Sequence, residues 1–169
     1  MLTYIGIGSN LGDALDNCRR AIQAISSDKS NHLLKCSPFY RTEPVGRTDQ
    51  PWFVNGVVAV KTLLSPRDLL AFILNIEKNM GRERGERWGP RVIDLDLLFY
   101  NKQILNEAGM QIPHPRLHER RFVLIPLQDI APHLQHPVLG KTVSQILSEL
   151  PETEEVLSIL ERGQRPCRV

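Results

Sequence analysis

Residues 92–100 are the part of the sequence that most restricts how this chain can fold; they read VIDLDLLFY. The run is rich in β-branched and aromatic residues, and turn residues flank it at 89–90 and 101–102, so it predicts a strand. Because side chains alternate along a strand, Asp94 and Asp96 project from one face, with their Cα atoms roughly 7 Å apart. The opposite face is expected to carry Ile93, Leu95, Leu97 and Phe99. Adjacent carboxylates repel each other and resist burial, so the polar face predicts a positively charged partner.

The order of the other elements indicates the fold class. Hydrophobic periodicity predicts strands over 2–9, 32–42, 52–62 and 92–100, and helices that end near Ser27 and Gly81. Pro38 interrupts the second strand, which favours an edge position or a bulge. The resulting β-α-β-β-α-β order predicts an α+β protein with a ferredoxin-like core, in which helices pack on a mainly antiparallel sheet.

The rest of the chain predicts extra C-terminal elements. Residues 103–105 could pair with the 92–100 strand as a hairpin, and residues 122–130 favour a short helix despite Pro126. Thr142 and Gln145 form a capping-box pattern before another helix. We expect a single domain over residues 1–162 and a flexible tail over 163–169.

Composition argues against several classes of protein. The 169 residues carry a net charge of +2, which is too mild to indicate nucleic-acid or membrane binding, and no apolar run approaches transmembrane length. Cys18, Cys36 and Cys167 lack the spacing of a metal site or a disulfide framework, which favours reduced thiols. We therefore expect a cytoplasmic monomer that binds neither nucleic acid nor membranes.

Residues 82–91, RERGERWGPR, supply positive charge just before the aspartate strand. Carboxylates suit a hard cation such as Mg²⁺, and guanidinium groups suit phosphate oxygens. The run can also be a solvated loop whose arginines pair with Glu83 and Glu86, and a D-x-D strand can simply form surface salt bridges. The sequence has no GxxxxGK[ST] motif and only a weak dinucleotide pattern at residues 6–12.

Phe53, Asn55 and Phe122 fit a site that stacks a flat heterocycle and binds its edge, but core packing also explains them and is the simpler explanation for Phe122. Glu77, Trp88 and His114 are each open to a structural explanation.

Several motifs together resemble the 6-hydroxymethyl-7,8-dihydropterin pyrophosphokinase family. They are GIGSNLGD at the start, SPFYRTEP, QPWFVN, RWGPRVIDLDLL, HPR and RRFVLIPLQDIAP. The resemblance implies a folate-pathway enzyme that transfers pyrophosphate from ATP to the hydroxymethyl group of the pterin and releases AMP.

The resemblance also implies roles for individual residues. Asp94 and Asp96 would hold two Mg²⁺ ions and, with Arg82 and Arg91, form the catalytic set. ATP would contact Glu77, Arg82, Arg84, Arg87, Trp88, Arg91, Leu97, His114 and Arg120. The pterin would contact Gly8, Thr42, Glu43, Pro44, Val45, Phe53, Asn55, Asp94 and Phe122. Departures from the family pattern are Phe53, where tyrosine is common, and Leu74, Gly109 and Gln111 near the expected adenine pocket.

Two other classes remain compatible with parts of the sequence. A ferredoxin-like nucleic-acid-binding module would share the element order, but the sequence lacks a basic stripe. A D-x-D metal-dependent hydrolase or nucleotidyl transferase would release phosphate or pyrophosphate instead of transferring it to a small alcohol. The 43–51 and 82–91 segments are predicted to be loops that close over the substrates.

Overall fold

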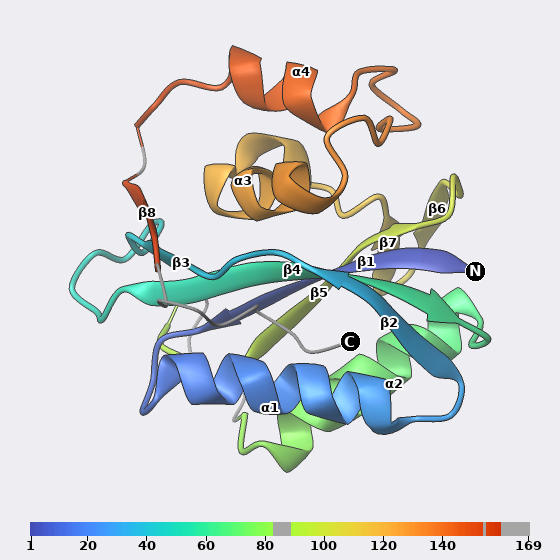
Figure 1. Cartoon of the computed structure of the whole chain (residues 1–169), viewed down its shortest axis with the longest axis horizontal. Coiled ribbons are helices and arrows are strands. Elements are labelled where there is room, and N and C mark those ends of the chain that lie inside the picture. Colours follow the sequence, from blue (N-terminus) through green and yellow to red (C-terminus); the bar gives the residue numbers. More distant parts are fainter. Residues whose placement is uncertain (83–88, 154, 160–169) are drawn as a thin grey trace.

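The computed structural model describes residues 1–82, 89–153 and 155–159. In these residues the centre of the molecule is a six-stranded sheet in which every strand pair is antiparallel (Figure 1). The strands are β1 (Leu2–Ser9), β2 (Asn31–Cys36), β3 (Tyr40–Thr42), β4 (Phe53–Thr62), β5 (Asp94–Tyr100) and β8 (Val156–Ser158). Their order is β5-β1-β4-β3-β8, and β2 also pairs with β4. The predicted ferredoxin-like core is confirmed, with β2 and β3 as the two halves of the strand that Pro38 interrupts.

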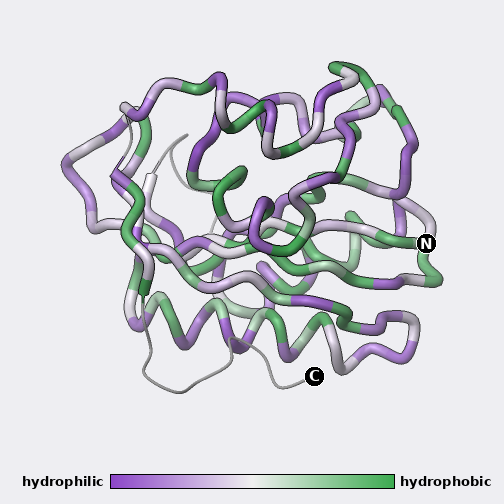
Figure 2. The backbone as a smooth tube through the Cα atoms, turned by 45° about the horizontal axis from the view of Figure 1, so that its top comes forward, coloured by the Kyte–Doolittle hydropathy of each residue, from purple (hydrophilic) through white to green (hydrophobic). Residues whose placement is uncertain are grey.

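Two layers of helices cover the sheet. Helices α1 (Ala14–Ser27) and α2 (Pro66–Asn79) lie on one face, while α3 (Arg121–Ile130) lies on the other with α4 (Val143–Glu149) stacked above it (Figure 1). Hydrophobic and hydrophilic stretches alternate along α1 in Figure 2, as expected for a helix with one buried side. No helix in the described part of the chain combines the length and apolar character needed to cross a membrane.

The helix ends follow the local sequence signals. Ser65 caps α2 by accepting a hydrogen bond from the Asp68 N–H, and Pro66 occupies the first turn. The capping box predicted at Thr142 is present at the start of α4. These elements begin where the sequence predicts because their caps use side chains only a few residues away.

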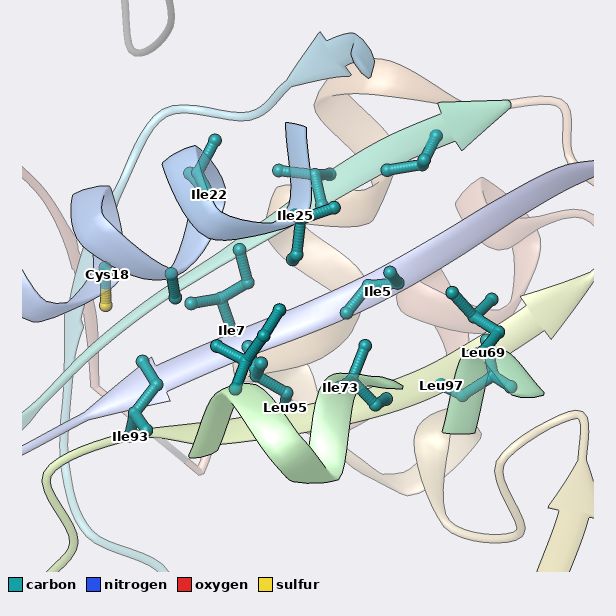
Figure 3. Packing of buried hydrophobic residues seen from close by; sticks show 14 of the residues in the cluster. Ile5, Ile7, Cys18, Ile22, Ile25, Leu69, Ile73, Ile93, Leu95 and Leu97 are labelled. Atoms are coloured by element: carbon teal, nitrogen blue, oxygen red, sulfur yellow. The ribbon is translucent and has the colours of Figure 1, made fainter. Parts of the chain in front are cut away.

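The larger core lies between the sheet and the α1–α2 layer. Figure 3 shows Ile5 and Ile7 of β1 packed against side chains of both helices, including Ile25 and Ile73. A second core forms on the opposite face, where α3 covers Leu98 and Phe99. The sheet is therefore apolar on both faces over most of its area, while Asn55, Asp94 and Asp96 lie near the carboxyl end of β1.

The prediction that Phe99 lies on the same face of the sheet as Leu95 and Leu97 is wrong. The pairing of β1 with β5 shifts between Tyr4 and Ile5, so that Leu97 opposes Ile5 while Phe99 opposes Tyr4. Leu98 is the extra residue, and both Leu98 and Phe99 pack toward α3. A bulge of this kind reverses the alternation of side chains beyond it.

The expected hairpin between residues 103–105 and the aspartate strand is also wrong. Asn101 continues the pairing with β1, because its N–H donates to the Leu2 carbonyl while its side chain accepts from the Leu2 N–H. The chain then leaves the sheet, and β6 (Leu105–Glu107) pairs with β7 (Met110–Ile112) instead.

Two further points depart from the sequence analysis. Strand β8 was not predicted, since its three residues carry no distinctive pattern; they add to the β3 edge. Cys36 is disulfide-bonded, which corrects the expectation of reduced thiols, whereas Cys18 is free and buried.

Candidate active site

A cavity of about 220 Å³ opens on the face of the sheet that α3 covers. Its floor is a row of residues across three strands, because Gly8 of β1 lies opposite both Asn55 of β4 and Asp94 of β5. Side chains at alternate positions share a face, so Asp96 joins this row on the same side. Antiparallel pairing therefore brings together residues that are up to 88 positions apart in the sequence, from Gly8 to Asp96.

Glycine at position 8 leaves room for the Asn55 amide. A Cβ at Gly8 would lie 2.6 Å from the Asn55 Oδ1 atom, so any side chain would displace it. The Asn55 Nδ2 group donates to the Thr42 hydroxyl at 2.7 Å, and both residues are buried. The amide is thus held in one orientation at the cavity wall, as the edge of a heterocycle would require.

Aromatic side chains complete this half of the cavity. Phe53 on β4 and Phe122 at the start of α3 both line it. The Arg120 guanidinium lies 5.6 Å from the centre of the Phe122 ring. Arg120 therefore connects the aromatic half of the cavity with the carboxylates, which it also approaches.

Arginines hold the two aspartates from different sides. One carboxylate oxygen of Asp94 lies 2.7 Å from Arg82 and the other lies 2.7 Å from Arg91. Asp96 is more weakly held, with Arg120 at 3.5 Å and the His114 Nε2 atom at 4.0 Å. The positive partner predicted for the carboxylate pair is therefore made of arginines from three segments of the chain.

Burial shifts the pKa values of Asp96 and His114 in opposite directions. Burial and the nearby Asp94 charge raise the pKa of Asp96 to about 6, against the opposing effect of Arg120. Burial and Arg120 lower the pKa of His114 to about 4, so this imidazole is neutral at neutral pH. Its Nδ1 accepts from the Arg116 N–H, which leaves Nε2 as the protonated nitrogen facing Asp96.

Glu77 lies behind the carboxylate pair and lines neither cavity. It is 3% exposed, accepts a 2.6 Å hydrogen bond from the Leu95 N–H and pairs with Arg82. Burial raises the pKa of Glu77, although the Leu95 N–H and Arg82 oppose this. In this structure Glu77 fixes α2 against β5 and orients Arg82, whose guanidinium spans Glu77 and Asp94.

A second cavity, of about 420 Å³, adjoins the first. The two share Arg82, Asp94, Asp96 and His114 as a common wall. Leu97 lines the second cavity together with Leu74, Gly109 and Gln111, the three departures from the family pattern that were expected near the adenine pocket. The carboxylate pair thus stands between one cavity with aromatic walls and another of mixed character.

The carboxylates also fit a divalent cation. Within the described residues no group of three or more His, Cys, Asp or Glu side chains forms a ready-made metal site. Two carboxylates alone suit Mg²⁺, which retains water and takes phosphate oxygens as further ligands.

Most of the residues predicted for the site come together in the structure. The cavities bring together Gly8, Thr42, Val45, Phe53, Asn55, Arg82, Arg91, Asp94, Asp96, Leu97, His114, Arg120 and Phe122. Glu43 and Pro44 line neither cavity, and Glu43 instead bonds to Glu155 beside β8. Arg84, Arg87 and Trp88 lie outside the described residues.

Some lining residues were not predicted. Val57 continues the alternation of Phe53 and Asn55 along β4, so its place follows from the strand period. Val123 directly follows the predicted Phe122, and Gln50 begins the QPWFVN motif, but neither was assigned to the site. Met110 and Pro115 enter the second cavity only because β7 and the segment after it pass beside β5.

Comparison with known proteins identifies the class as a pyrophosphokinase. The family model described as 7,8-dihydro-6-hydroxymethylpterin-pyrophosphokinase matches residues 4–132, and the chain belongs to this family. It is therefore an enzyme of folate biosynthesis.

Named relatives agree. The chain is 42% identical over 146 residues to the 2-amino-4-hydroxy-6-hydroxymethyldihydropteridine pyrophosphokinase of Synechocystis, covering 86% of this chain and 74% of that protein. The Methylorubrum extorquens enzyme of the same name is 42% identical, with 87% and 92% covered. The folic acid synthesis protein FOL1 of Dictyostelium discoideum is 39% identical, but only 24% of it is covered.

Solved structures support the fold. Wild-type HPPK-DHPS of Plasmodium falciparum superposes with a TM-score of 0.69 at 15% identity, covering 88% of this chain and 44% of that one. The same protein with pteroate gives 0.69 at 16% identity, with 88% and 42% covered. The chain thus spans less than half the length of these structures.

Proposed function

We propose that the protein transfers the β- and γ-phosphates of ATP, as one pyrophosphoryl group, to the hydroxyl of 6-hydroxymethyl-7,8-dihydropterin. The products are AMP and the pterin diphosphate. The observation that carries the proposal is the meeting of two cavities at Asp94 and Asp96. A carboxylate pair at such a junction suits a reaction between two substrates that enter from different sides.

The pterin occupies the cavity with aromatic walls. Phe53 and Phe122 stack on the two faces of the ring, and Asn55 bonds its edge in the orientation that Thr42 holds. Gly8, Thr42 and Val45 bound the remaining sides, while Glu43 and Pro44 belong to the adjoining loop. In this pose the hydroxymethyl group reaches toward Asp94.

ATP occupies the second cavity with its phosphates at the common wall. Leu97 and His114 contact the nucleoside side, and Glu77 contributes by orienting Arg82. Arginines at 82, 91 and 120 neutralise the phosphates, and Arg84, Arg87 and Trp88 are proposed to add to this set.

Asp94 and Asp96 are proposed to hold two Mg²⁺ ions. When bound, the metal polarises the phosphoryl oxygens and lowers the proton affinity of the attacking hydroxyl. Asp94 must then exchange its present arginine partners for the cation, which frees Arg82 and Arg91 for the phosphates. The side chains thereby supply position and charge, which are the main needs of phosphoryl transfer.

One assay tests the proposal. The protein is incubated with Mg²⁺·ATP, with and without 6-hydroxymethyl-7,8-dihydropterin, and the nucleotide products are separated. We expect AMP and pterin diphosphate to form in equal amounts and only when the pterin is present. ADP as the product, or AMP that forms without the pterin, would contradict the proposal and favour a kinase or a hydrolase.

A cytoplasmic location and a monomeric state stay predictions of the sequence analysis. Cell fractionation and size-exclusion chromatography with light scattering would test them.

A further inference from the structure

Asn10 is a buried polar residue beside the site that lines neither cavity. It follows the last residue of β1 and is 3% exposed. Its side chain makes hydrogen bonds to two segments that lie far from it in the sequence, around residues 50 and 91. Gln50 and Arg91 both line the first cavity, and Arg91 also binds Asp94 of the wall that the two cavities share.

The bonds to Arg91 resemble a continuation of the sheet. The backbone N–H of Asn10 donates to the Arg91 carbonyl at 3.1 Å, and the Arg91 N–H donates to the Asn10 Oδ1 atom at 2.8 Å. Together they fix the backbone of Arg91, whose guanidinium binds Asp94. The Asn10 side-chain oxygen therefore fixes the backbone position from which the Arg91 side chain extends toward Asp94.

The amide nitrogen of Asn10 binds the loop that precedes β4. It donates to the Gln50 Oε1 atom and to the Pro51 carbonyl, each at 3.0 Å. Gln50 lines the first cavity and also bonds back to the Arg47 carbonyl at 2.7 Å. The loop before β4 is thus tied to Asn10 by a side chain and by a backbone carbonyl.

Both hydrogens of the Asn10 side-chain amide are used, and Asn10 directly follows β1. Nearby, the buried Asn17 of α1 donates to the Leu11 carbonyl and the Ser9 hydroxyl, which holds the turn that follows β1. A planar amide whose two ends bind two loops transmits a shift of one loop to the other. A substitution that breaks the hydrogen bonds of the amide nitrogen but keeps that of the oxygen should uncouple the two loops.

We propose that Asn10 is a positioning residue that couples the binding of the acceptor to the placement of Arg91 on the phosphate side. Ordering of the 43–51 loop around the acceptor, through Gln50 and Pro51, favours the Asn10 orientation that holds the Arg91 backbone. Conversely, when the nucleotide orders Arg91, the same Asn10 orientation favours the ordered 43–51 loop. The inference rests on the proposed function, because it requires one substrate in each cavity.

The test compares Asn10→Asp with Asn17→Asp as a matched control. Asn10→Asp keeps an oxygen for the Arg91 N–H but sets a carboxylate against the Gln50 and Pro51 oxygens. Asn17→Asp makes the same change in a buried asparagine of α1 whose side chain hydrogen-bonds Ser9 and Leu11.

Calorimetry measures the affinity for 6-hydroxymethylpterin with and without α,β-methylene-ATP and Mg²⁺. In the wild type and Asn17→Asp, each ligand should tighten the other about five-fold or more. In Asn10→Asp, the factor by which one ligand tightens the binding of the other should fall to about one. The affinity for the nucleotide in the absence of pterin should change less than about two-fold.

The wild type provides a second measurement that depends on no variant. In ¹⁵N NMR spectra the Arg91 backbone amide should shift when the pterin alone is added, and the Gln50 side-chain amide should shift with the nucleotide alone. Coupling that survives in Asn10→Asp, or an Arg91 amide that does not respond to the pterin, overturns the inference. Absence of any pterin binding to the wild type instead overturns the proposed function itself, and the inference with it.

Discussion

Replacing Asp96 by asparagine should remove activity and yet stabilise the ligand-free protein at neutral pH. Burial and the Asp94 charge raise the pKa of Asp96 to about 6, above the ordinary value of 3.8. The folded protein therefore holds the proton more tightly than the unfolded chain does. This destabilising contribution is absent below about pH 3.8, grows as the pH rises, and is complete above about pH 6.

The size of the effect follows from the same pKa. The difference between 3.8 and about 6 corresponds to about 3 kcal/mol for a fully buried group. Because 34% of the Asp96 side chain is exposed, solvent screening reduces this to roughly 1–2 kcal/mol. For a chain of this length each kcal/mol raises the midpoint of thermal unfolding by about 2–4 °C.

The midpoint of thermal unfolding, measured without ligands at neutral pH and near pH 4, tests this predicted change in stability. Asp96→Asn should raise the midpoint at neutral pH, and the gain should shrink as the pH approaches the ordinary carboxyl value of 3.8. Asp94→Asn is the matched control, and it should lower the midpoint, since it removes the negative charge and one of the two oxygens that lie 2.7 Å from Arg82 and Arg91. A lower midpoint for Asp96→Asn at neutral pH, or an equal gain at both pH values, would refute the reasoning.

Three further outcomes are expected. Gly8→Ala should weaken pterin binding about ten-fold or more and leave binding of an ATP analogue unchanged in calorimetry, because the new Cβ would lie 2.6 Å from the Asn55 oxygen. Arg91→Ala should lower kcat more than it raises KM for ATP, since Arg91 pairs with Asp94 at the wall where negative charge develops on the transferred phosphates. An unchanged kcat with a raised KM would contradict this. Chelation of Mg²⁺ with EDTA should abolish AMP formation while pterin binding survives, and AMP formation should return when Mg²⁺ is added back.

The sequence determines features that depend on near neighbours. Helix starts at Ser65 and Thr142 are readable because each cap bonds to a residue three positions away. The aspartate strand is readable because alternation and the following turn specify its end at Tyr100 and the shared face of Asp94 and Asp96, although it begins two residues later than the predicted residue 92. The resemblance to a family adds residue roles that spacing cannot supply.

Errors arose where distant partners decide the local geometry. The bulge between β1 and β5, which turns Phe99 toward α3, depends on how two strands 92 positions apart in sequence align, from Ile5 to Leu97. The supposed hairpin failed because Asn101 is held by Leu2 of β1. Neither partner is visible from the segment itself.

The site divides in the same way. The sequence by itself shows that Asp94 and Asp96 share a face and need positive partners, because both facts follow from the period of a strand and from Coulomb repulsion. Only the tertiary structure decides that Arg120 meets Asp96 and that Asn10 joins the two loops. Antiparallel pairing brings together residues that are remote in sequence, and their hydrogen bonds exist only once the sheet has formed.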